Sequence, residues 1–364
     1  MKKNAVAEAL LRAGIPMPPG APFYFKGEYG YRNRMDFVFS EKGPGFRRSG
    51  KFYRFVNFEE CFISNDGINS ALGEVTAWFN ENREKISVFD VVKKQGVLRY
   101  STIRSSYFTE DSSVTFILNK DAPHDALEAH RGLISEFGAL SGCKNILIGL
   151  VKSNSDLSAV DDAVVVKGRE FLEERLGPCK FFYHTQGFFQ NNSAVTMDML
   201  FYAREKAGSG YDCLLDLFGG VGTFGIFLKD AAAEAIIADN SQTGRVCAEM
   251  NIRENNAGNV SYIHFEAVKP GELHAEFEGK KTIFILDPPR AGMHKKTMKF
   301  ILTSAPERII YISCNPVRLG EDMRALSTKY NMTDMAMFDM FPQTRHIECA
   351  VVLDKKNGLN NQAR

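Results

Sequence analysis

The pattern of hydrophobic and polar residues changes character near residue 190. Before that point, period-two segments separated by glycine predict hairpin strands between residues 31 and 56. Further strands are predicted near 97–104, 113–118, 144–151 and 163–167, and helices over 4–13, 66–86 and 124–138. This mixture has no regular strand–helix–strand rhythm. It therefore predicts an α+β domain over residues 1–180.

Strands and helices alternate through the rest of the chain. Helices are predicted over 193–206, 223–229 and 241–255, and strands near 213–218, 235–239, 260–264, 282–286, 308–313, 334–339 and 346–353. Such alternation is typical of a doubly wound, mostly parallel sheet, so an α/β domain is expected over residues 181–364. Ligands of these sheets bind outside the carboxyl ends of the strands. Ligand-binding and catalytic residues are therefore expected at the strand ends.

A glycine-rich turn follows the first strand of this second domain. Gly220, Gly222 and Gly225 satisfy the G-x-G-x-x-G fingerprint, and Asp239 ends the next strand, placed for a ribose hydroxyl. Sites for NAD and for S-adenosylmethionine share this pattern. Asp216, beside the turn, would repel a diphosphate but attract the sulfonium and ammonium groups of S-adenosylmethionine. Electrostatics thus favours S-adenosylmethionine, while an NAD-dependent oxidoreductase and a merely capping Asp216 stay open as alternatives.

Three later strand ends also carry candidate functional side chains. Asp287 precedes two prolines, which cannot extend a β-ladder and so fix the exit of the chain. Cys314 stands before a proline-fixed turn, where its thiolate could act as a nucleophile, although a lone cysteine is more often inert packing. Glu348 lies in an otherwise apolar strand, where a carboxylate is costly unless it is paired or used. His346 alone is better explained as a structural histidine.

Composition bounds the class of protein. With 364 residues the chain has room for about two domains, and 44% hydrophobic with 24% charged residues is typical of globular proteins. No stretch approaches the ~18 apolar residues of a membrane helix, and the first residues lack the apolar core of a signal peptide. Seven widely spaced cysteines favour neither a metal site nor a disulfide framework. A soluble, cytoplasmic protein without a metal site is expected.

Positive charge and aromatic residues gather near the N-terminus. Residues 1–120 hold 18 Lys and Arg against 13 Asp and Glu, and twelve aromatic residues fall between Phe23 and Phe58. Cations that reach phosphates, with rings that stack on bases, predict binding of single-stranded RNA. The alternative is a hairpin pair with its rings in a core and its charges in solvent. The cations chosen as RNA contacts are Arg32, Arg34, Arg47 and Arg48.

Taken together, these motifs resemble the RNA 5-methyluridine methyltransferases, the family of the transfer RNA T-loop enzyme and its ribosomal RNA relatives. The resemblance spans residues 183–353, with a looser match in Tyr31-Arg32-Asn33-Arg34 and Gly45-Phe46-Arg47. Its segments are Phe188-Phe189-Gln190-Asn191-Asn192, the glycine turn, Asn255-Asn256, Asn259-Val260, Asp287-Pro288-Pro289-Arg290-x-Gly292, Ser313-Cys314-Asn315-Pro316 and Phe341-Pro342-Gln343-Thr344-x-His346-x-Glu348. A Rossmann-like methyltransferase sheet behind an N-terminal α+β RNA-binding domain is the implied fold.

The resemblance also implies a mechanism. Cys314 would add to C6 of uracil, C5 would take a methyl group from S-adenosylmethionine, and Glu348 would remove the C5 proton. Covalent addition is needed because C5 of uracil is a poor nucleophile by itself, and the target base is expected to leave its stack. The implied cofactor contacts are Gln190, Phe218, Thr223, Asp239 and Asp287, beside Gly220 and Gly222 of the turn.

The RNA target is less closely defined. The family's ribosomal members often carry four cysteines for an iron–sulfur cluster and an N-terminal barrel. This chain lacks such a cysteine set, so no iron–sulfur cluster is expected. Its Tyr-Arg segment begins at residue 31, which is too early to leave room for the barrel. That layout favours the T-loop uridine of transfer RNA, although residues 30–61 look closer to the ribosomal branch, which keeps 23S ribosomal RNA as the alternative.

Two other classes of protein stay open. A methyltransferase acting on an exocyclic amine would be expected to show Asn-Pro-Pro-aromatic in place of Asp287-Pro288-Pro289-Arg290. In a non-catalytic RNA-binding protein, Cys314 would be dispensable packing. No obligate protein partner and no membrane attachment are indicated by the sequence.

Overall fold

The computed structural model describes residues 1–158, 160, 163–267 and 269–356, and the chain forms two compact units. Unit 1 comprises Met1–Lys26, Leu176–Phe182 and Ala194–Arg364. Unit 2 comprises Gly27–Arg175 and Tyr183–Ser193. The chain passes between the units after Lys26, after Ser193 and twice within the hairpin of β9 (Phe171–Leu176) and β10 (Cys179–His184).

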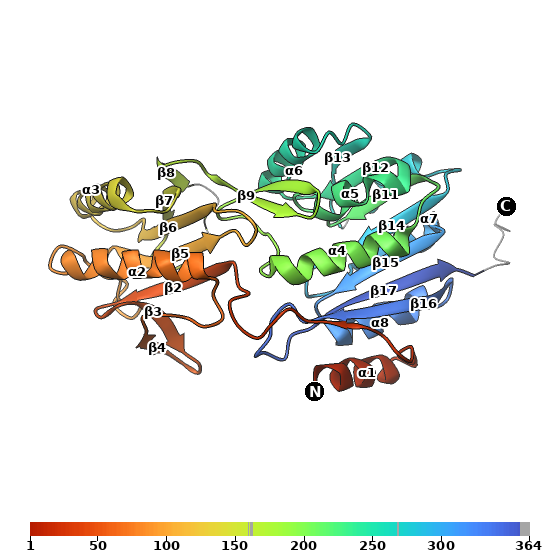
Figure 1. Ribbon diagram of the computed structural model, residues 1–364, viewed down its shortest axis with the longest axis horizontal. Helices are drawn as coiled ribbons and strands as arrows, with labels where there is room; N and C mark the ends of the chain where they lie inside the picture. Colours follow the sequence, from red (N-terminus) through yellow and green to blue (C-terminus); the bar gives the residue numbers. More distant parts are fainter. Residues whose placement is uncertain (159, 161–162, 268, 357–364) are drawn as a thin grey trace. The chain divides into compact units, whose positions relative to one another are not determined.

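Unit 1 is built on an eight-stranded sheet in the order β1-β16-β17-β15-β14-β11-β12-β13 (Figure 1). Neighbours from β15 to β13 are parallel, whereas β17 is antiparallel to both β15 and β16. The order reverses between β11 and β14, which is where doubly wound sheets bind ligands. The strand bounds are β1 (Phe23–Tyr24), β11 (Tyr211–Leu217), β12 (Ala232–Asp239), β13 (Val260–His264), β14 (Thr282–Leu286), β15 (Arg308–Ser313), β16 (Tyr330–Phe338) and β17 (Glu348–Lys355).

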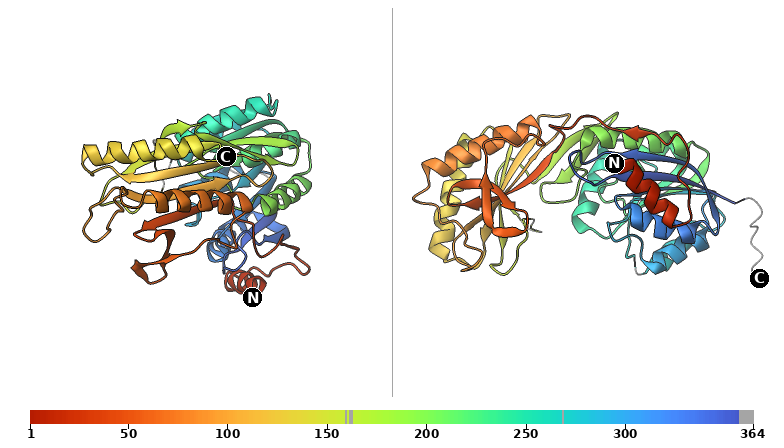
Figure 2. Two further views of the ribbon diagram at one scale, coloured as in Figure 1. Left: turned by 60° about the vertical axis from the view of Figure 1, so that its left-hand side comes forward. Right: turned by 90° about the horizontal axis from the view of Figure 1, so that it is seen from below.

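Helices cover both faces of this sheet. One face forms a large apolar core with α1 (Lys2–Arg12), α7 (Lys295–Ser304) and α8 (Pro316–Leu326). The other face carries α4 (Ser193–Ala207), α5 (Thr223–Phe227) and α6 (Gln242–Glu254), and short 3-10 turns lie at Lys229–Ala231 and Pro270–Glu276. Helix α1 lies beside α8 (Figure 2). The predicted Rossmann-like sheet is confirmed.

Unit 2 contains a seven-stranded mixed sheet in the order β4-β3-β2-β5-β6-β7-β8. Its helices α2 (Asp66–Glu81) and α3 (His124–Leu140) share one core with the sheet. The strand bounds are β2 (Arg34–Ser40), β3 (Gly43–Arg48), β4 (Lys51–Asn57), β5 (Leu98–Ser105), β6 (Ser112–Asn119), β7 (Asn145–Val151) and β8 (Ala163–Lys167). β6 and β7 are parallel and flank α3, a strand–helix–strand unit that the sequence reading did not anticipate.

The first 26 residues differ from their predicted placement with the N-terminal domain. Val6 and Leu10 of α1 are wholly buried in the core of unit 1, and β1 pairs in parallel with β16. Long-range pairing of this kind leaves no signal in local periodicity. In the part of the chain that is described, no helix combines the length and the apolar character needed to span a bilayer.

Candidate active site

Because side chains alternate along a strand, the predicted catalytic and cofactor-binding residues of unit 1 lie on one face of the sheet. Leu215, Leu217, Ala238, Leu286, Tyr311 and Cys349 all belong to the core packed against α1, α7 and α8. Successive side chains of a strand point to opposite faces. Asp216, Asp239, Asp287, Cys314 and Glu348 therefore share the opposite face, at the edge where β11, β12, β14 and β15 end and the antiparallel β17 begins.

The glycine turn after β11 wraps around the carboxylate of Asp216. This residue is completely buried, and its Oδ2 accepts a hydrogen bond from Gly225 N at 2.7 Å. Its Oδ1 has no partner among the described residues. A Cβ built on Gly219 would lie 2.7 Å from Asp216 Oδ2, so only glycine fits there. The turn thus presents a buried carboxylate oxygen with an unfilled acceptor position.

Backbone strain marks the same turn. Phe218, Gly220 and Gly222 have φ values of 67°, 54° and 85°, and Phe218 is the costly case because it carries a side chain. No atom lies within 4 Å of a Cβ built on Gly220, so that side of the turn is open. Thr223 begins α5 directly after the turn. These four residues form the wall predicted to contact a cofactor.

Asp239 and Asp287 flank the turn. Asp239 Oδ2 accepts from Gly220 N at 3.1 Å and its Oδ1 from Ser241 N at 2.8 Å. Asp287 N donates to Leu217 O at 3.3 Å, which fixes the first residue after β14 beside the end of β11. Burial raises the pKa of Asp216 and of Asp287 to about 7 each. The edge of the sheet therefore concentrates carboxylates that favour a positively charged ligand.

Cys314 occupies a turn held by its own neighbours. Asn315 caps α8 by accepting from Val317 N at 3.2 Å, and its Nδ2 donates to Arg290 O at 3.2 Å. Ser313 Oγ accepts from Asn315 N at 3.3 Å. The half-buried thiol thus stands just before the N-terminus of α8, between two strand ends. Sequence reasoning gave Asn315 no role; a proline directly after an asparagine is the capping signal that could have found it.

Glu348 reaches the same edge from β17. Ser313 pairs with Cys349 across the antiparallel β15–β17 ladder, so Glu348 lies next to Cys314 in register. Glu348 is buried, with 9% of the residue exposed. Strand β17 begins at Glu348, which leaves His346 outside the strand that was predicted over 346–353. Its ring instead meets the edge of Phe341, with 6.3 Å between centroids.

Electrostatics couples the thiol to the carboxylates. Burial, followed by the charges of Glu348 and Asp287, raises the pKa of Cys314 to about 11. Burial and the charge of Asp287 raise the pKa of Glu348 to about 8. Arg290 acts in the opposite direction on the thiol and favours its thiolate. The thiol of Cys314 is therefore mostly protonated at neutral pH.

Alkylation of Cys314 is expected to respond to the charge of Glu348. Replacing Glu348 with glutamine removes a negative charge beside the thiol, so the thiol pKa should fall and iodoacetamide should react faster at pH 9. Peptide mass spectrometry of Cys314 measures the rate. The half-buried Cys61 of unit 2 is the internal control and should not change. An unchanged Cys314 rate would show that the two groups are not coupled.

The predicted RNA contacts lie in unit 2. Arg32 Nε donates to Arg34 O at 3.0 Å, and Arg34 Nε to Asp36 Oδ1 at 3.2 Å. Arg47 forms two hydrogen bonds with the carboxylate of Asp156, at 2.6 and 3.0 Å. Arg48 is exposed on the β3–β4 hairpin, opposite Lys51. Its guanidinium is therefore better placed than that of Arg47 to meet a phosphate.

Gln190 also lies in unit 2. The side chain of Asn33 donates to Gln190 O at 2.9 Å and to Ser193 Oγ at 3.0 Å, which anchors this segment. The cofactor contact predicted for Gln190 stays a prediction.

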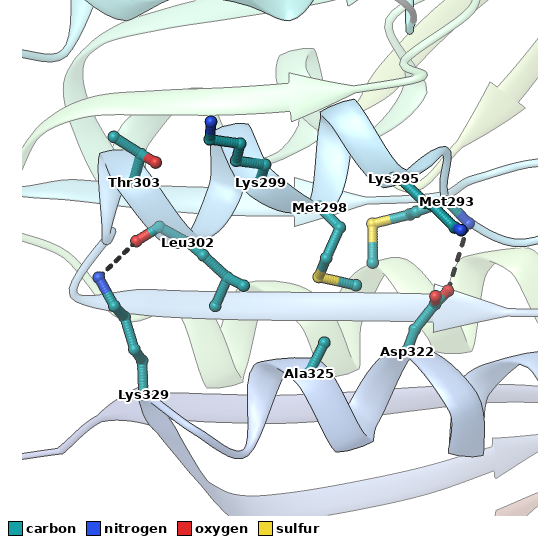
Figure 3. A pocket seen from close by; sticks show the side chains of 9 residues that line it. All are labelled: Met293, Lys295, Met298, Lys299, Leu302, Thr303, Asp322, Ala325 and Lys329. Carbon is teal, nitrogen blue, oxygen red and sulfur yellow. Dashed lines mark hydrogen bonds between the residues drawn. The ribbon is translucent and has the colours of Figure 1, made fainter.

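A further pocket of unit 1 lies between α7 and α8 and has a volume of about 480 Å3 (Figure 3). Met293, Met298, Leu302 and Ala325 form its apolar part, and Lys329 Nζ donates to Leu302 O at 2.8 Å. None of the predicted site residues lines it. Among the described residues, no three His, Cys, Asp or Glu side chains are grouped as metal ligands.

The strand order and the strand-end chemistry define a Rossmann-like methyltransferase sheet that carries a cysteine and a glutamate at the same edge as its glycine turn. A comparison with family models adds a match to the tRNA (Uracil-5-)-methyltransferase family over residues 156–356. The chain belongs to this family, and it is therefore an enzyme of the RNA uracil-5-methyltransferase class. The resemblance seen in the sequence motifs is confirmed.

Individual relatives agree with this assignment. A tRNA (uracil(54)-C(5))-methyltransferase of Pyrococcus abyssi is 31% identical over 89% of this chain and 74% of its own length. An uncharacterised RNA methyltransferase of Caldanaerobacter subterraneus is 30% identical over 98% of this chain and 79% of its own. The crystal structure of the Pyrococcus abyssi tRNA (uracil-54, C5)-methyltransferase with S-adenosyl-L-homocysteine matches with a TM-score of 0.79 at 27% identity, covering 97% of this chain and 81% of that one.

Proposed function

We propose that the protein transfers a methyl group from S-adenosylmethionine to C5 of a uridine in transfer RNA, through a covalent bond between Cys314 and the uracil ring. In this proposal unit 1 carries the methyl transfer and unit 2 recognises the RNA. The observation that carries it is the register of β15 and β17, which sets a cysteine and a buried glutamate side by side at the ligand-binding edge of the sheet.

The residues of the glycine turn fit S-adenosylmethionine. The turn combines the unpartnered Oδ1 of Asp216, the open side of Gly220 and the half-buried ring of Phe218, and the carboxylate supplies negative charge. Asp239 has acceptor capacity left for ribose hydroxyls. The relative of known structure is described with S-adenosyl-L-homocysteine, the demethylated product of this cofactor. When bound, S-adenosylmethionine supplies an electrophilic methyl group.

The chain's own residues perform two steps on the uracil. The Cys314 thiolate forms a C–S bond at C6, and the displaced electron pair makes C5 nucleophilic. Once C5 carries the methyl group, Glu348 takes the proton from C5, the C6–S bond breaks, and its electrons return to sulfur. This splits a reaction at a poorly nucleophilic carbon into two easier ones. Release of one proton to solvent restores both side chains.

Transfer RNA and its T-loop uridine are the proposed target because the relatives from Pyrococcus are named for uracil 54 of transfer RNA. The direct test is to incubate the protein with labelled S-adenosylmethionine and unmodified transfer RNA, and to locate 5-methyluridine by nuclease mapping. A transcript with cytidine at position 54 should lose the label. Methylation of 23S ribosomal RNA with none of transfer RNA would refute the target, and no 5-methyluridine in either RNA would refute the reaction.

Affinity for S-adenosylmethionine is expected to rise with pH between 6 and 8. Asp216 and Asp287 each have a raised pKa of about 7, so below that pH a cationic ligand must displace a proton to gain its counter-charge. Calorimetry in buffers of different ionisation heat measures that proton release. 5′-Methylthioadenosine, a neutral nucleoside, should show little pH dependence.

The variant that tests the role of this charge is Asp216→Asn. It keeps an acceptor for Gly225 N, and it should weaken S-adenosylmethionine binding by about tenfold or more, because a charged contact is lost. Binding of 5′-methylthioadenosine should stay as it is. If both ligands weaken equally, Asp216 only supports the turn and does not act through its charge.

The two neighbouring arginines of the β3–β4 hairpin should differ in their effect on RNA. Arg48→Ala should weaken RNA binding and reduce the slope of log affinity against log salt by about one unit, because one phosphate contact is lost. Arg47→Ala should leave the slope nearly unchanged, because Asp156 already neutralises Arg47. Fluorescence anisotropy across a salt series measures both. Equal slopes for Arg48→Ala and the unaltered protein would remove the hairpin from the RNA site.

A further inference from the structure

We propose that unit 2 binds one unpaired guanine base of the RNA in a groove beside the N-terminus of α2. The inference rests on the proposed function, since it takes RNA as the substrate, and it concerns residues apart from the methyl-transfer chemistry. The groove has a volume of about 760 Å3, and all of its lining belongs to unit 2. We call it the aromatic groove; it is lined by Tyr29, Asp66, Ser70, Tyr107, Thr109 and Glu110, among others.

Exposed aromatic rings gather at this groove. Tyr29 and Tyr107 line it and are 60% and 42% exposed. Each is braced by an exposed phenylalanine: Tyr29 meets Phe62 edge to face at 6.3 Å between centroids, and Tyr107 meets Phe108 at 5.0 Å. Apolar surface gathered in this way marks an interaction site more often than chance exposure. Planar rings on the wall of a groove favour a planar ligand.

The backbone of Tyr107 is held by hydrogen bonds to a buried glutamate. The carboxylate of Glu174 is fully buried and accepts from Tyr107 N at 2.8 Å and from Phe108 N at 2.9 Å. Ser193 Oγ donates to the same carboxylate at 2.6 Å. A buried carboxyl group thus holds the turn that carries an exposed ring. Rigid presentation lowers the entropy cost of binding, which is typical of a recognition site.

The charge of the aromatic groove excludes the RNA backbone. Among the described residues, its lining includes the carboxylates of Asp66, Glu74 and Glu110 and no lysine or arginine. Phosphates would therefore be repelled, whereas a base edge with hydrogen-bond donors would be attracted. Glu74 Oε2 already accepts from Ser141 Oγ and Gly142 N, which leaves Asp66 and Glu110 as the exposed acceptors.

Guanine matches this set of groups best. Its N1–H and N2 amine form a parallel pair of donors that one carboxylate can accept, while the hydroxyl of Ser70 can donate to its O6. Unpaired bases stacked on aromatic side chains are the usual targets of RNA recognition. A lysine or arginine side chain of a protein partner would also be attracted, but it offers donors alone and would leave the hydroxyl donor of Ser70 unused.

The test uses the full chain with two kinds of probe. Saturation-transfer NMR compares the binding of guanosine, inosine and adenosine. Fluorescence anisotropy measures binding of unmodified transfer RNA, and methylation kinetics measure KM and kcat for it. Guanosine should bind in preference to inosine, which lacks the N2 amine, and to adenosine. Asp66→Asn together with Glu110→Gln should abolish the preference over adenosine. Tyr107→Ala should weaken RNA binding about tenfold and raise KM for RNA with kcat nearly unchanged, whereas Tyr107→Phe, which keeps the stacking ring, should behave as the unaltered protein.

Contrary results separate the alternatives. If an arginine-rich peptide saturates the aromatic groove and guanosine does not, the occupant is a protein segment and the proposal is overturned. It is also overturned if Tyr107→Ala and Tyr107→Phe bind RNA equally well. Methylation by the unaltered protein is measured in the same series, so loss of the guanine site with methylation intact rejects this inference alone. Absence of methylation rejects the proposed function instead.

Discussion

Replacing Cys314 with alanine is expected to abolish methyl transfer to RNA, with a loss of roughly 10^4-fold or more, as for other covalent nucleophiles. The reason is that C5 of uracil gains its nucleophilicity only when a nucleophile adds at C6. Cofactor binding should persist, because the turn around Asp216 is built on β11 and β12 and Cys314 follows β15. Transfer of labelled methyl into RNA measures the first effect, and calorimetry with S-adenosylmethionine measures the second.

The control is Cys349→Ala. Cys349 neighbours the site in sequence but is wholly buried on the opposite face of β17, in the core with α7 and α8. Its loss should cost stability of about 1–2 kcal/mol through a small cavity, with turnover largely kept. If Cys314→Ala retains turnover comparable to Cys349→Ala, covalent catalysis is refuted and the thiol is packing.

Local sequence patterns predicted the elements that carry the site. Strands 260–264, 282–286 and 308–313 agree with the structure to the residue, and the last two are short apolar runs bounded by polar or turn residues. Their ends then fixed the candidate chemistry, since parallel strands of one sheet end at one edge. The Cys314–Glu348 pairing needed the ladder itself: β17 is antiparallel, and only its register with β15 brings the start of one strand to the end of the other.

The features that sequence reasoning missed depend on contacts between distant segments. Helix α8 contains Gly320, a poor helix former, and the structure explains it: a Cβ there would lie 3.0 Å from Ala13 Cβ of the segment after α1. Helix α7 has an apolar run, Phe300-Ile301-Leu302, that suits a strand equally well. Arg47 was chosen as an RNA contact because the chain gives no hint that Asp156, 109 residues away, pairs with it.

Replacing Glu348 with glutamine is expected to stop the reaction after methyl transfer and to leave the protein joined to RNA through Cys314. Glutamine keeps the shape of the side chain but cannot take the C5 proton, so the C6–S bond has no route to break. A band that survives denaturing electrophoresis and disappears on nuclease digestion measures the adduct. Its absence in the double variant Cys314→Ala/Glu348→Gln assigns the bond to that thiol.

The pH dependence of the release step tests the same residue independently. Glu348 acts as a base only when it is deprotonated, and its pKa is raised to about 8, so decay of the adduct in the unaltered protein should accelerate from pH 7 to pH 9. In Glu348→Gln the adduct should decay slowly at every pH in that range. Normal turnover in Glu348→Gln without a trapped adduct would show that another group removes the proton, because a glutamine in this buried position has no proton-accepting carboxylate to offer.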